Sequence, residues 1–136
     1  MTTTYNICGV TLRCSQGLCE DILCTAFEGG INYWAEDIAP TREKRDGDLG
    51  WAYTGGRVGY DDGDGELRGK DITREKVAHG IATIMQAGIE EGKRIVRPST
   101  YQYILEALVS GDTGMIDADI ADTIVQVALF GEVVYG

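Results

Sequence analysis

The apolar residues near the start of the chain alternate with polar ones, as they do in a β-strand. The alternation changes phase at Gly9, and one extra residue in a strand would account for that change. We therefore predict a strand over residues 4–13 with a bulge at Gly9. The alternating residues are Tyr5 and Ile7 before the glycine and Val10 and Leu12 after it.

A helical period follows this strand, with apolar residues three and four positions apart. Ser15 is suited to the N-cap position, because its hydroxyl can accept a hydrogen bond from a free N–H group of the first turn. Gly29 and Gly30 are predicted to end the helix, since glycine easily takes the left-handed conformation found at helix ends. The apolar face consists of Leu18, Ile22, Leu23 and Ala26.

The next 40 or so residues form short extended segments, joined by loops rich in Gly, Asp, Lys and Arg. This pattern is typical of antiparallel strands connected by hairpins. We predict strands at residues 31–38, 49–53, 57–60 and 66–72.

The second half of the chain returns to the helical period. One helix is predicted to begin at Thr73 and to end in the glycine-containing stretch 88–93, and the next begins at Pro98. The last helix is predicted to run from Asp117, a good N-cap, to Phe130. Its apolar residues cover more than half of its circumference, so we expect it to be the most buried helix.

The fold class predicted from these elements is α+β, with a small antiparallel β-sheet packed with three to four helices and the C-terminal helix most buried. The 136 residues include 43% apolar and 25% charged residues, which is ordinary for a globular protein. We therefore expect one domain over residues 1–136.

The formal charge of −10 narrows the classes of partner. Such a charge repels the phosphates of nucleic acids and anionic membranes, so we expect direct binding to neither. No apolar run approaches the roughly 20 residues that span a bilayer, and the first residues lack the pattern of a signal peptide. We therefore expect a cytoplasmic protein.

No motif of an enzyme, a metal centre or a dinucleotide site is complete in the sequence. The acidic run that starts at Asp62 has Leu67 where a calcium loop needs Gly and Thr73 where it needs Glu. His79 is the only histidine, so few catalytic pairs are available. The four cysteines form no CxxC pair, and we expect neither a metal nor a cofactor; they are Cys8, Cys14, Cys19 and Cys24.

The first candidate site surrounds the double glycine. Glu28 precedes Gly29 and Gly30, and Tyr33 and Trp34 follow them. Glycine lets a ligand approach the backbone closely, and an aromatic ring can stack on a planar ligand. If Tyr33 and Trp34 lie in a strand, their side chains point to opposite faces, so at most one lines a given pocket. Packing of both rings in the core is the alternative.

The second candidate site lies on the last helix and the segment after it. Asp119, Asp122 and Gln126 are three and four residues apart, so they form one polar stripe on an otherwise apolar helix. Acceptors on a buried helix could bind ribose hydroxyls or base edges, or the stripe could simply face water. Phe130 and Tyr135 could close the pocket or belong to the core.

Two segments of the chain resemble a family of small uncharacterised proteins from bacteriophages, plasmids and actinobacteria. The first is Ala26-Phe27-Glu28-Gly29-Gly30 followed by Tyr33-Trp34, and the second runs from Asp117-Ala118-Asp119 to Val133-Val134-Tyr135-Gly136. The resemblance implies a mobile-element setting and no established activity. Small phage proteins often counter host defence, by sequestering nucleotide signals or by blocking a defence complex.

Two functional hypotheses follow. The first is a non-enzymatic binding protein for a nucleotide-type signal, with a pocket where the two candidate segments meet; it predicts that Trp34 and Gln126 lie close together. We expect such a protein to be a homo-oligomer, because pockets are often completed at subunit boundaries. The second is an acidic inhibitor of a host defence complex, which would need one continuous acidic face. We do not expect an enzyme.

Overall fold

The computed structural model describes residues 2–47 and 50–136 and shows a small α+β fold. Four α-helices, one π-helical turn and two antiparallel sheets make up the described part of the chain. The elements are β1 (Thr2–Ile7), β2 (Val10–Ser15), α1 (Gln16–Thr25), η1 (Ala26–Gly30), β3 (Ala35–Lys44), β4 (Trp51–Asp61), β5 (Leu67–Thr73), α2 (Arg74–Gly88), α3 (Pro98–Ser110) and α4 (Ala118–Phe130).

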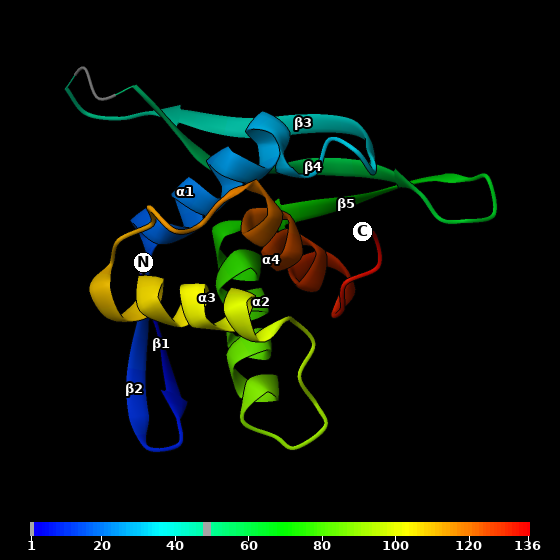
Figure 1. The fold of residues 1–136 in the computed structure, drawn as a ribbon. Helices are drawn as coiled ribbons and strands as arrows, with labels where there is room; N and C mark the ends of the chain where they lie inside the picture. The colour runs from blue at the N-terminus through cyan, green and yellow to red at the C-terminus, as the bar shows by residue number, and fades with distance from the viewer. Residues whose placement is uncertain (1, 48–49) are drawn as a thin grey trace.

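The sheet of β3, β4 and β5 covers one side of a group of helices (Figure 1). Strand β4 is central and pairs antiparallel with both neighbours. The separate β1–β2 hairpin extends at the other end of the molecule, beside α2 and α3 (Figure 1). Among the described residues no helix is both long and apolar enough to cross a membrane.

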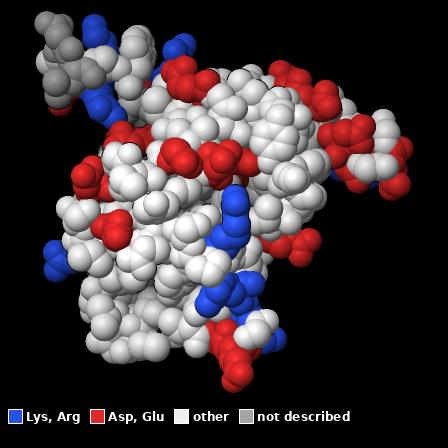
Figure 2. Space-filling model, viewed as in Figure 1, with Lys and Arg blue, Asp and Glu red and all other residues white. Residues whose placement is uncertain are grey.

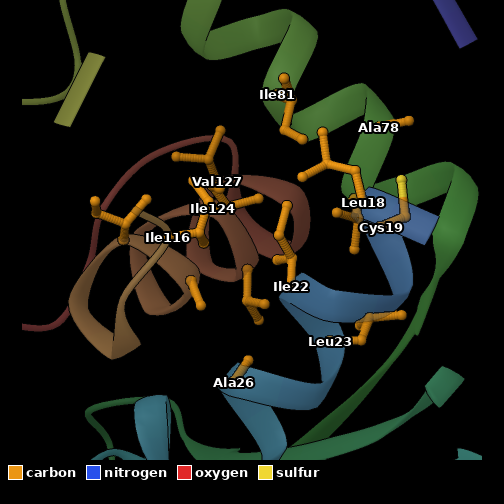
Figure 3. Packing of buried hydrophobic residues seen from close by; sticks show 14 of the residues in the cluster. Leu18, Cys19, Ile22, Leu23, Ala26, Ala78, Ile81, Ile116, Ile124 and Val127 are labelled. Atoms are coloured by element: carbon orange, nitrogen blue, oxygen red, sulfur yellow. The ribbon is translucent and has the colours of Figure 1, made fainter. Parts of the chain in front are cut away.

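Helix α4 carries the largest set of buried residues of the four helices, as predicted from its wide apolar surface. Figure 3 shows Ile124 and Val127 of α4 pointing toward Ile22 of α1 and Ile81 of α2. Helices α2 and α4 approach closely, because Gly80 of α2 lies against the backbone of Ala128. Buried residues of both sheets and all four helices form one hydrophobic cluster.

Three of the predicted helix starts are confirmed by their hydrogen bonds. The side chains of Ser15, Thr73 and Asp117 accept hydrogen bonds from backbone N–H groups in the first turns of α1, α2 and α4. Helix α3 differs, because it begins with Pro98 after Arg97 and has no side-chain cap.

The predicted bulge at Gly9 is wrong. Residues 4–13 form two strands of a hairpin, in which Tyr5 pairs with Leu12. Cys8 and Gly9 both have positive φ, 51° and 79°, and two such residues make the tight turn that reverses a chain between antiparallel strands. The change of phase in the hydrophobic pattern therefore marks a reversal of the chain.

The predicted strands of the middle region need two further corrections. Residues 31–34 form a turn, because the N–H of Ala35 donates to the carbonyl of Ile31 at 2.9 Å, and the strand begins only at Ala35. The two predicted segments at 49–53 and 57–60 belong to the single strand β4, although residue 49 lies outside the described residues.

Candidate functional site

The turn at residues 31–34 directs two neighbouring aromatic side chains toward helix α4. The hydroxyl of Tyr33 donates to Oδ2 of Asp122 at 2.6 Å, and the indole N–H of Trp34 donates to Oδ1 at 2.7 Å. The strand on which the alternation of these two side chains depended begins only at Ala35, so they do not alternate faces. Neighbouring residues alternate faces only in an extended strand, and here the chain turns.

Gln126 joins this carboxylate to the C-terminal segment. Its Nε2 donates to Asp122 Oδ1 at 2.9 Å and to the carbonyl of Tyr135 at 3.1 Å, with a longer contact of 3.3 Å to the Tyr33 hydroxyl. Its Oε1 accepts from the N–H groups of Val134 and Tyr135 at 2.8 and 2.7 Å. Trp34 and Gln126 therefore share one acceptor, as the first hypothesis requires, and the segment after α4 is held in place.

This polar network is closed on itself. Asp122 is 7% exposed and Gln126 is fully buried, yet within the described part of the chain no buried side-chain nitrogen or oxygen lacks a hydrogen-bond partner. Lost hydration of the hydroxyl and its bond to the Asp122 carboxylate raise the pKa of Tyr33 to about 12. Gln126 has no capacity left for a ligand, because the protein itself uses its donors and acceptor.

Trp34 lies behind the network in an aromatic cluster. Its ring stacks on Tyr135 with a centroid distance of 4.9 Å and an interplanar angle of 2°, and Phe130 meets it edge-on at 5.8 Å. Tyr60 also meets Phe130 edge-on, with a centroid distance of 5.0 Å. Trp34 is buried, so of the two adjacent rings only Tyr33, which is 61% exposed, can meet a ligand without rearrangement.

A cleft of about 530 Å³ opens beside Tyr33. One wall is the first half of α4, another is the start of α3 with the three residues before it, and the C-terminal segment forms a third. Four of the ten predicted site residues line it: Tyr33, Asp119, Asp122 and Tyr135. The other lining residues are Ile95, Val96, Arg97, Thr100, Thr123, Val133 and Gly136.

The double glycine and the residue before it do not line the cleft. The carboxylate of Glu28 accepts a hydrogen bond from the Tyr53 hydroxyl at 2.6 Å, on the side of the sheet. Gly30 is buried against α4, where a Cβ atom would lie 2.8 Å from the carbonyl oxygen of Ala118. Gly29 has open space around it. A close approach to a glycine was predicted, and Gly30 has one, but the group that approaches it is the backbone of α4 and not a ligand.

The start of α3 was not predicted as a wall of the site. Sequence reasoning named Arg97 only as one of three arginines that could neutralise an anionic group near the double glycine. Arg97 and Thr100 carry no recognisable motif, and only the poor capping residue before Pro98 distinguishes this helix from the others. The segment enters the cleft because α3 packs along α2, with the Tyr101 hydroxyl donating to the carbonyl of Met85 at 3.1 Å. Tertiary packing, which the sequence pattern does not reveal, brings the start of α3 opposite α4.

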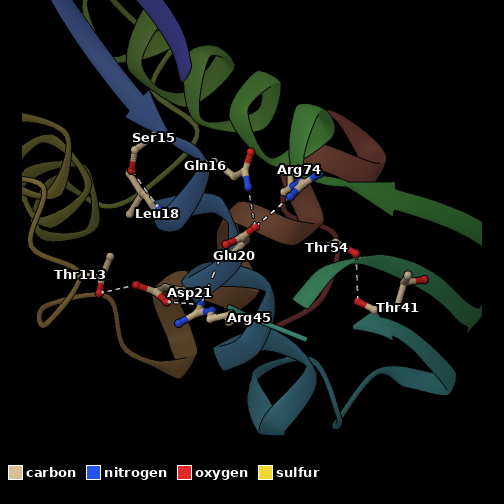
Figure 4. A network of polar contacts seen from close by, with 10 residues as sticks. All are labelled: Ser15, Gln16, Leu18, Glu20, Asp21, Thr41, Arg45, Thr54, Arg74 and Thr113. Carbon is tan, nitrogen blue, oxygen red and sulfur yellow. Dashed lines mark hydrogen bonds and ion pairs between the residues drawn. The ribbon is translucent and has the colours of Figure 1, made fainter. Parts of the chain in front are cut away.

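A second buried carboxylate, Glu20, has a structural role. It is 8% exposed, and Arg74 donates to it at 2.8 Å while Gln16 donates at 3.2 Å (Figure 4). Arg45 lies 4.0 Å from its other oxygen. Two side chains of the protein donate to this carboxylate and a third cation lies near it, so its buried charge is compensated by the protein itself.

The cysteines show no arrangement for metal binding. Cys14 and Cys19 are buried with their sulfur atoms 3.4 Å apart, and the neighbouring thiol together with burial raises the pKa of Cys19. A buried protonated thiol behaves as a small apolar side chain. Among the described residues no three His, Cys, Asp or Glu side chains are placed to hold one ion.

On the face shown in Figure 2, acidic side chains are spread across the upper half and the right end, and basic side chains gather mainly at the upper left and below the centre. In the acidic loop between β4 and β5, Arg68 bonds to Asp62 at 2.9 Å and to Glu66 at 3.4 Å. The N–H of Asp64 and this guanidinium hold the pKa of Asp62 below its usual range. The loop is therefore partly neutralised by its own arginine.

The chain matches no protein-family model and is significantly similar to no curated protein and to no solved structure. The chemistry of the cleft must therefore be read from its own residues. It offers an exposed aromatic ring, a carboxylate on α4, a guanidinium at the start of α3 and several apolar side chains. These groups suit the binding of a planar molecule that carries polar substituents.

Proposed function

We propose that this protein is a non-enzymatic binding protein whose ligand is a nucleotide-type small molecule held in the cleft beside Tyr33. The observation that carries the proposal is the fixed ring of Tyr33. Its hydroxyl is held by Asp122 at 2.6 Å, while the ring itself remains 61% exposed at the cleft. An aromatic surface that is already oriented loses little conformational entropy when a base stacks on it.

Other residues that line the cleft support the same ligand class. Asp119 is exposed on α4, and its carboxylate can accept hydrogen bonds from ribose hydroxyls. Val96 and Val133 supply apolar contact for a planar base. The volume of about 530 Å³ is that of an ordinary small-molecule site.

The resemblance of residues 26–34 and 117–136 to phage and plasmid proteins extends the proposal to a biological role. In that setting the protein would sequester nucleotide signals of host defence in the cytoplasm of the host cell, and it would do so as a homo-oligomer. The second hypothesis, an acidic inhibitor of a defence complex, receives less support. The face in Figure 2 carries groups of basic as well as acidic side chains, and Arg68 neutralises part of the most acidic loop.

The proposal is tested by native mass spectrometry of protein purified from cells, followed by thermal-shift measurements with nucleosides, nucleotides, cyclic dinucleotides and ADP-ribose derivatives. A bound ligand raises the melting temperature in proportion to RT ln(1 + [L]/Kd). We expect at least one nucleotide-type compound to co-purify or to raise the melting temperature. If none does, the proposal is wrong.

Two variants of Tyr33 separate the ring from the hydroxyl. Tyr33→Phe and Tyr33→Leu both lose the bond to Asp122, but only Tyr33→Leu loses the aromatic face. We expect Tyr33→Phe to bind the ligand within about threefold of the wild type and Tyr33→Leu to bind at least about tenfold more weakly, since stacking on an aromatic ring contributes about 1–3 kcal/mol. Equal binding by both variants would exclude stacking on this ring.

A further inference from the structure

The first turn of α3 presents hydrogen-bond donors that the protein does not use. Helix α3 has 13 residues and no side-chain cap, and within the described residues no partner is found for the N–H groups of Ser99 and Thr100. The exposed Arg97, directly before the helix, forms no ion pair with any described residue. The start of a helix carries partial positive charge, so these donors together favour an anion.

Thr100 provides the independent observation. It is only 8% exposed and lines the cleft, and its hydroxyl has no hydrogen-bond partner in the described part of the chain. A threonine in the first turn of a helix usually bonds to a backbone carbonyl or faces water freely. Because no buried side-chain oxygen of the described residues lacks a partner, this unpaired oxygen is reached by solvent although the residue as a whole is buried. Thr100 lines the cleft, so its hydroxyl is available to a ligand there.

The two walls of the cleft have opposite polarity. Helix α4 contributes the carboxylates of Asp119 and Asp122, which repel an anion, and its own first turn is capped by Asp117. The start of α3 contributes Arg97 and the unpaired donors of Thr100. A ligand with an anionic group at one end and hydroxyl or amino donors at the other therefore fits in only one orientation.

We infer that the start of α3 is a phosphate subsite, in which Arg97, the Thr100 hydroxyl and the N–H groups of Ser99 and Thr100 hold the phosphate group of the ligand. This inference rests on the proposed function, and it adds that the base lies toward Tyr33 and the phosphate toward α3. Amide, hydroxyl and guanidinium donors that converge from different directions suit a tetrahedral oxyanion. Both a nucleotide phosphate and free phosphate share this chemistry.

Inorganic phosphate is the first probe, titrated at constant ionic strength and followed by ³¹P NMR. We expect Arg97→Gln to weaken phosphate binding by about tenfold or more, because a charge-assisted hydrogen bond is lost. Thr100→Val keeps the shape of the side chain and removes only the hydroxyl, and we expect about fivefold weaker binding. Arg94→Gln is the matched control, since Arg94 lines a different hollow beside Gly92 and the same charge is removed.

Adenosine and adenosine monophosphate are the second pair of probes. We expect the monophosphate to bind the wild type at least about tenfold more tightly than the nucleoside, and this advantage to disappear in Arg97→Gln. The melting temperature of Thr100→Val, measured without ligand, should equal that of the wild type, because the hydroxyl has no partner to lose. That measurement shows that weaker binding does not result from unfolding.

The outcomes separate this inference from the proposed function. If nucleosides bind as tightly as nucleotides, or if phosphate binds equally to Arg97→Gln, Thr100→Val and Arg94→Gln, the phosphate subsite is wrong while a nucleoside-binding cleft stands. If phosphate binds through Arg97 and Thr100 but no nucleoside or nucleotide binds more tightly than phosphate alone, the subsite stands and the proposed function is wrong.

Discussion

Asp122 and Thr100 are buried to the same extent and line the same cleft, but the protein uses their polar atoms differently. The Asp122 carboxylate accepts hydrogen bonds from Tyr33, Trp34 and Gln126. The Thr100 hydroxyl has no partner among the described residues. The two residues are therefore equally buried. They differ in whether other groups of the protein already use their hydrogen-bonding capacity.

This difference shows how a buried polar residue should be interpreted. A polar stripe on an apolar helix predicts that the polar atoms have partners, because a buried unpaired group costs about 1–3 kcal/mol. It does not predict that the partner is a ligand. For Asp122 and Gln126 the partners are a turn and the C-terminal segment of the same chain. Only polar groups whose hydrogen-bonding capacity the protein itself does not use, such as those of Thr100, point to a ligand.

The largest expected effect is the loss of stability in Asp122→Ala. This substitution leaves three donors without their acceptor, two of them in buried side chains, and we expect the free energy of unfolding to fall by about 4 kcal/mol. Urea denaturation followed by Trp fluorescence measures it. Thr100→Val should change the same quantity by less than about 0.5 kcal/mol.

Asp119→Ala is the matched control for Asp122→Ala. Asp119 lies on the same helix, but it is exposed and its carboxylate bonds to no described residue, so its removal should cost less than about 0.5 kcal/mol. If Asp122→Ala proves as stable as Asp119→Ala, the network does not hold the turn and the C-terminal segment. A large loss of unfolding free energy in Thr100→Val would contradict the claim that the Thr100 hydroxyl has no partner in the protein.

A smaller loss of stability is expected for Gly30→Ala, because the added methyl group would push the turn at residues 31–34 away from α4. The added Cβ would lie 2.8 Å from the carbonyl oxygen of Ala118, so the backbone must move, and we expect a loss of about 2 kcal/mol. In Gly17→Ala, on α1, the nearest atom to the new Cβ is 4.0 Å away, and a gain of about 0.5–1 kcal/mol is expected. Thermal denaturation of both variants measures the contrast; equal effects would show that the close contact with Ala118 does not matter.

The regular elements of the fold could be predicted from the sequence because they depend on local rules. Ser15 and Asp117 were predicted as N-caps from capping chemistry, and Thr73 was predicted as a helix start from the helical spacing that follows it. In the structure all three side chains accept a hydrogen bond from a first-turn N–H group. The errors lie where the chain changes direction. A phase shift in alternation fits a bulge or a reversal equally well, and only the positive φ of Cys8 and Gly9 decides between them.

The candidate site was predictable only in part, since its walls come from separate regions of the chain. Tyr33 and Asp122 were identified by residue type and spacing, and the structure brings them together. Glu28 was included because it is a neighbour in sequence, but its carboxylate bonds to Tyr53 on the sheet. The start of α3 carries ordinary residues, and its place in the cleft depends on how α3 packs on α2, which no local pattern encodes.

The smallest effect concerns alkaline pH and tests the surroundings of the Tyr33 hydroxyl, namely its lost hydration and its bond to Asp122. The folded state raises the pKa of Tyr33 from its usual value of about 10 to about 12, so the folded protein holds this proton more tightly than the unfolded chain. The resulting stabilisation is fully present below pH 10 and is lost as the pH rises through 12.

We therefore expect the stability difference between wild type and Tyr33→Phe to be constant up to about pH 9 and to shrink above pH 10. Urea denaturation of both proteins from pH 8 to pH 12 measures this difference, in which the ionisation of the other tyrosines cancels. A difference that stays constant across the whole range would show that the hydroxyl is neither desolvated nor held by the carboxylate, and the closed network would then lack its link to the exposed ring.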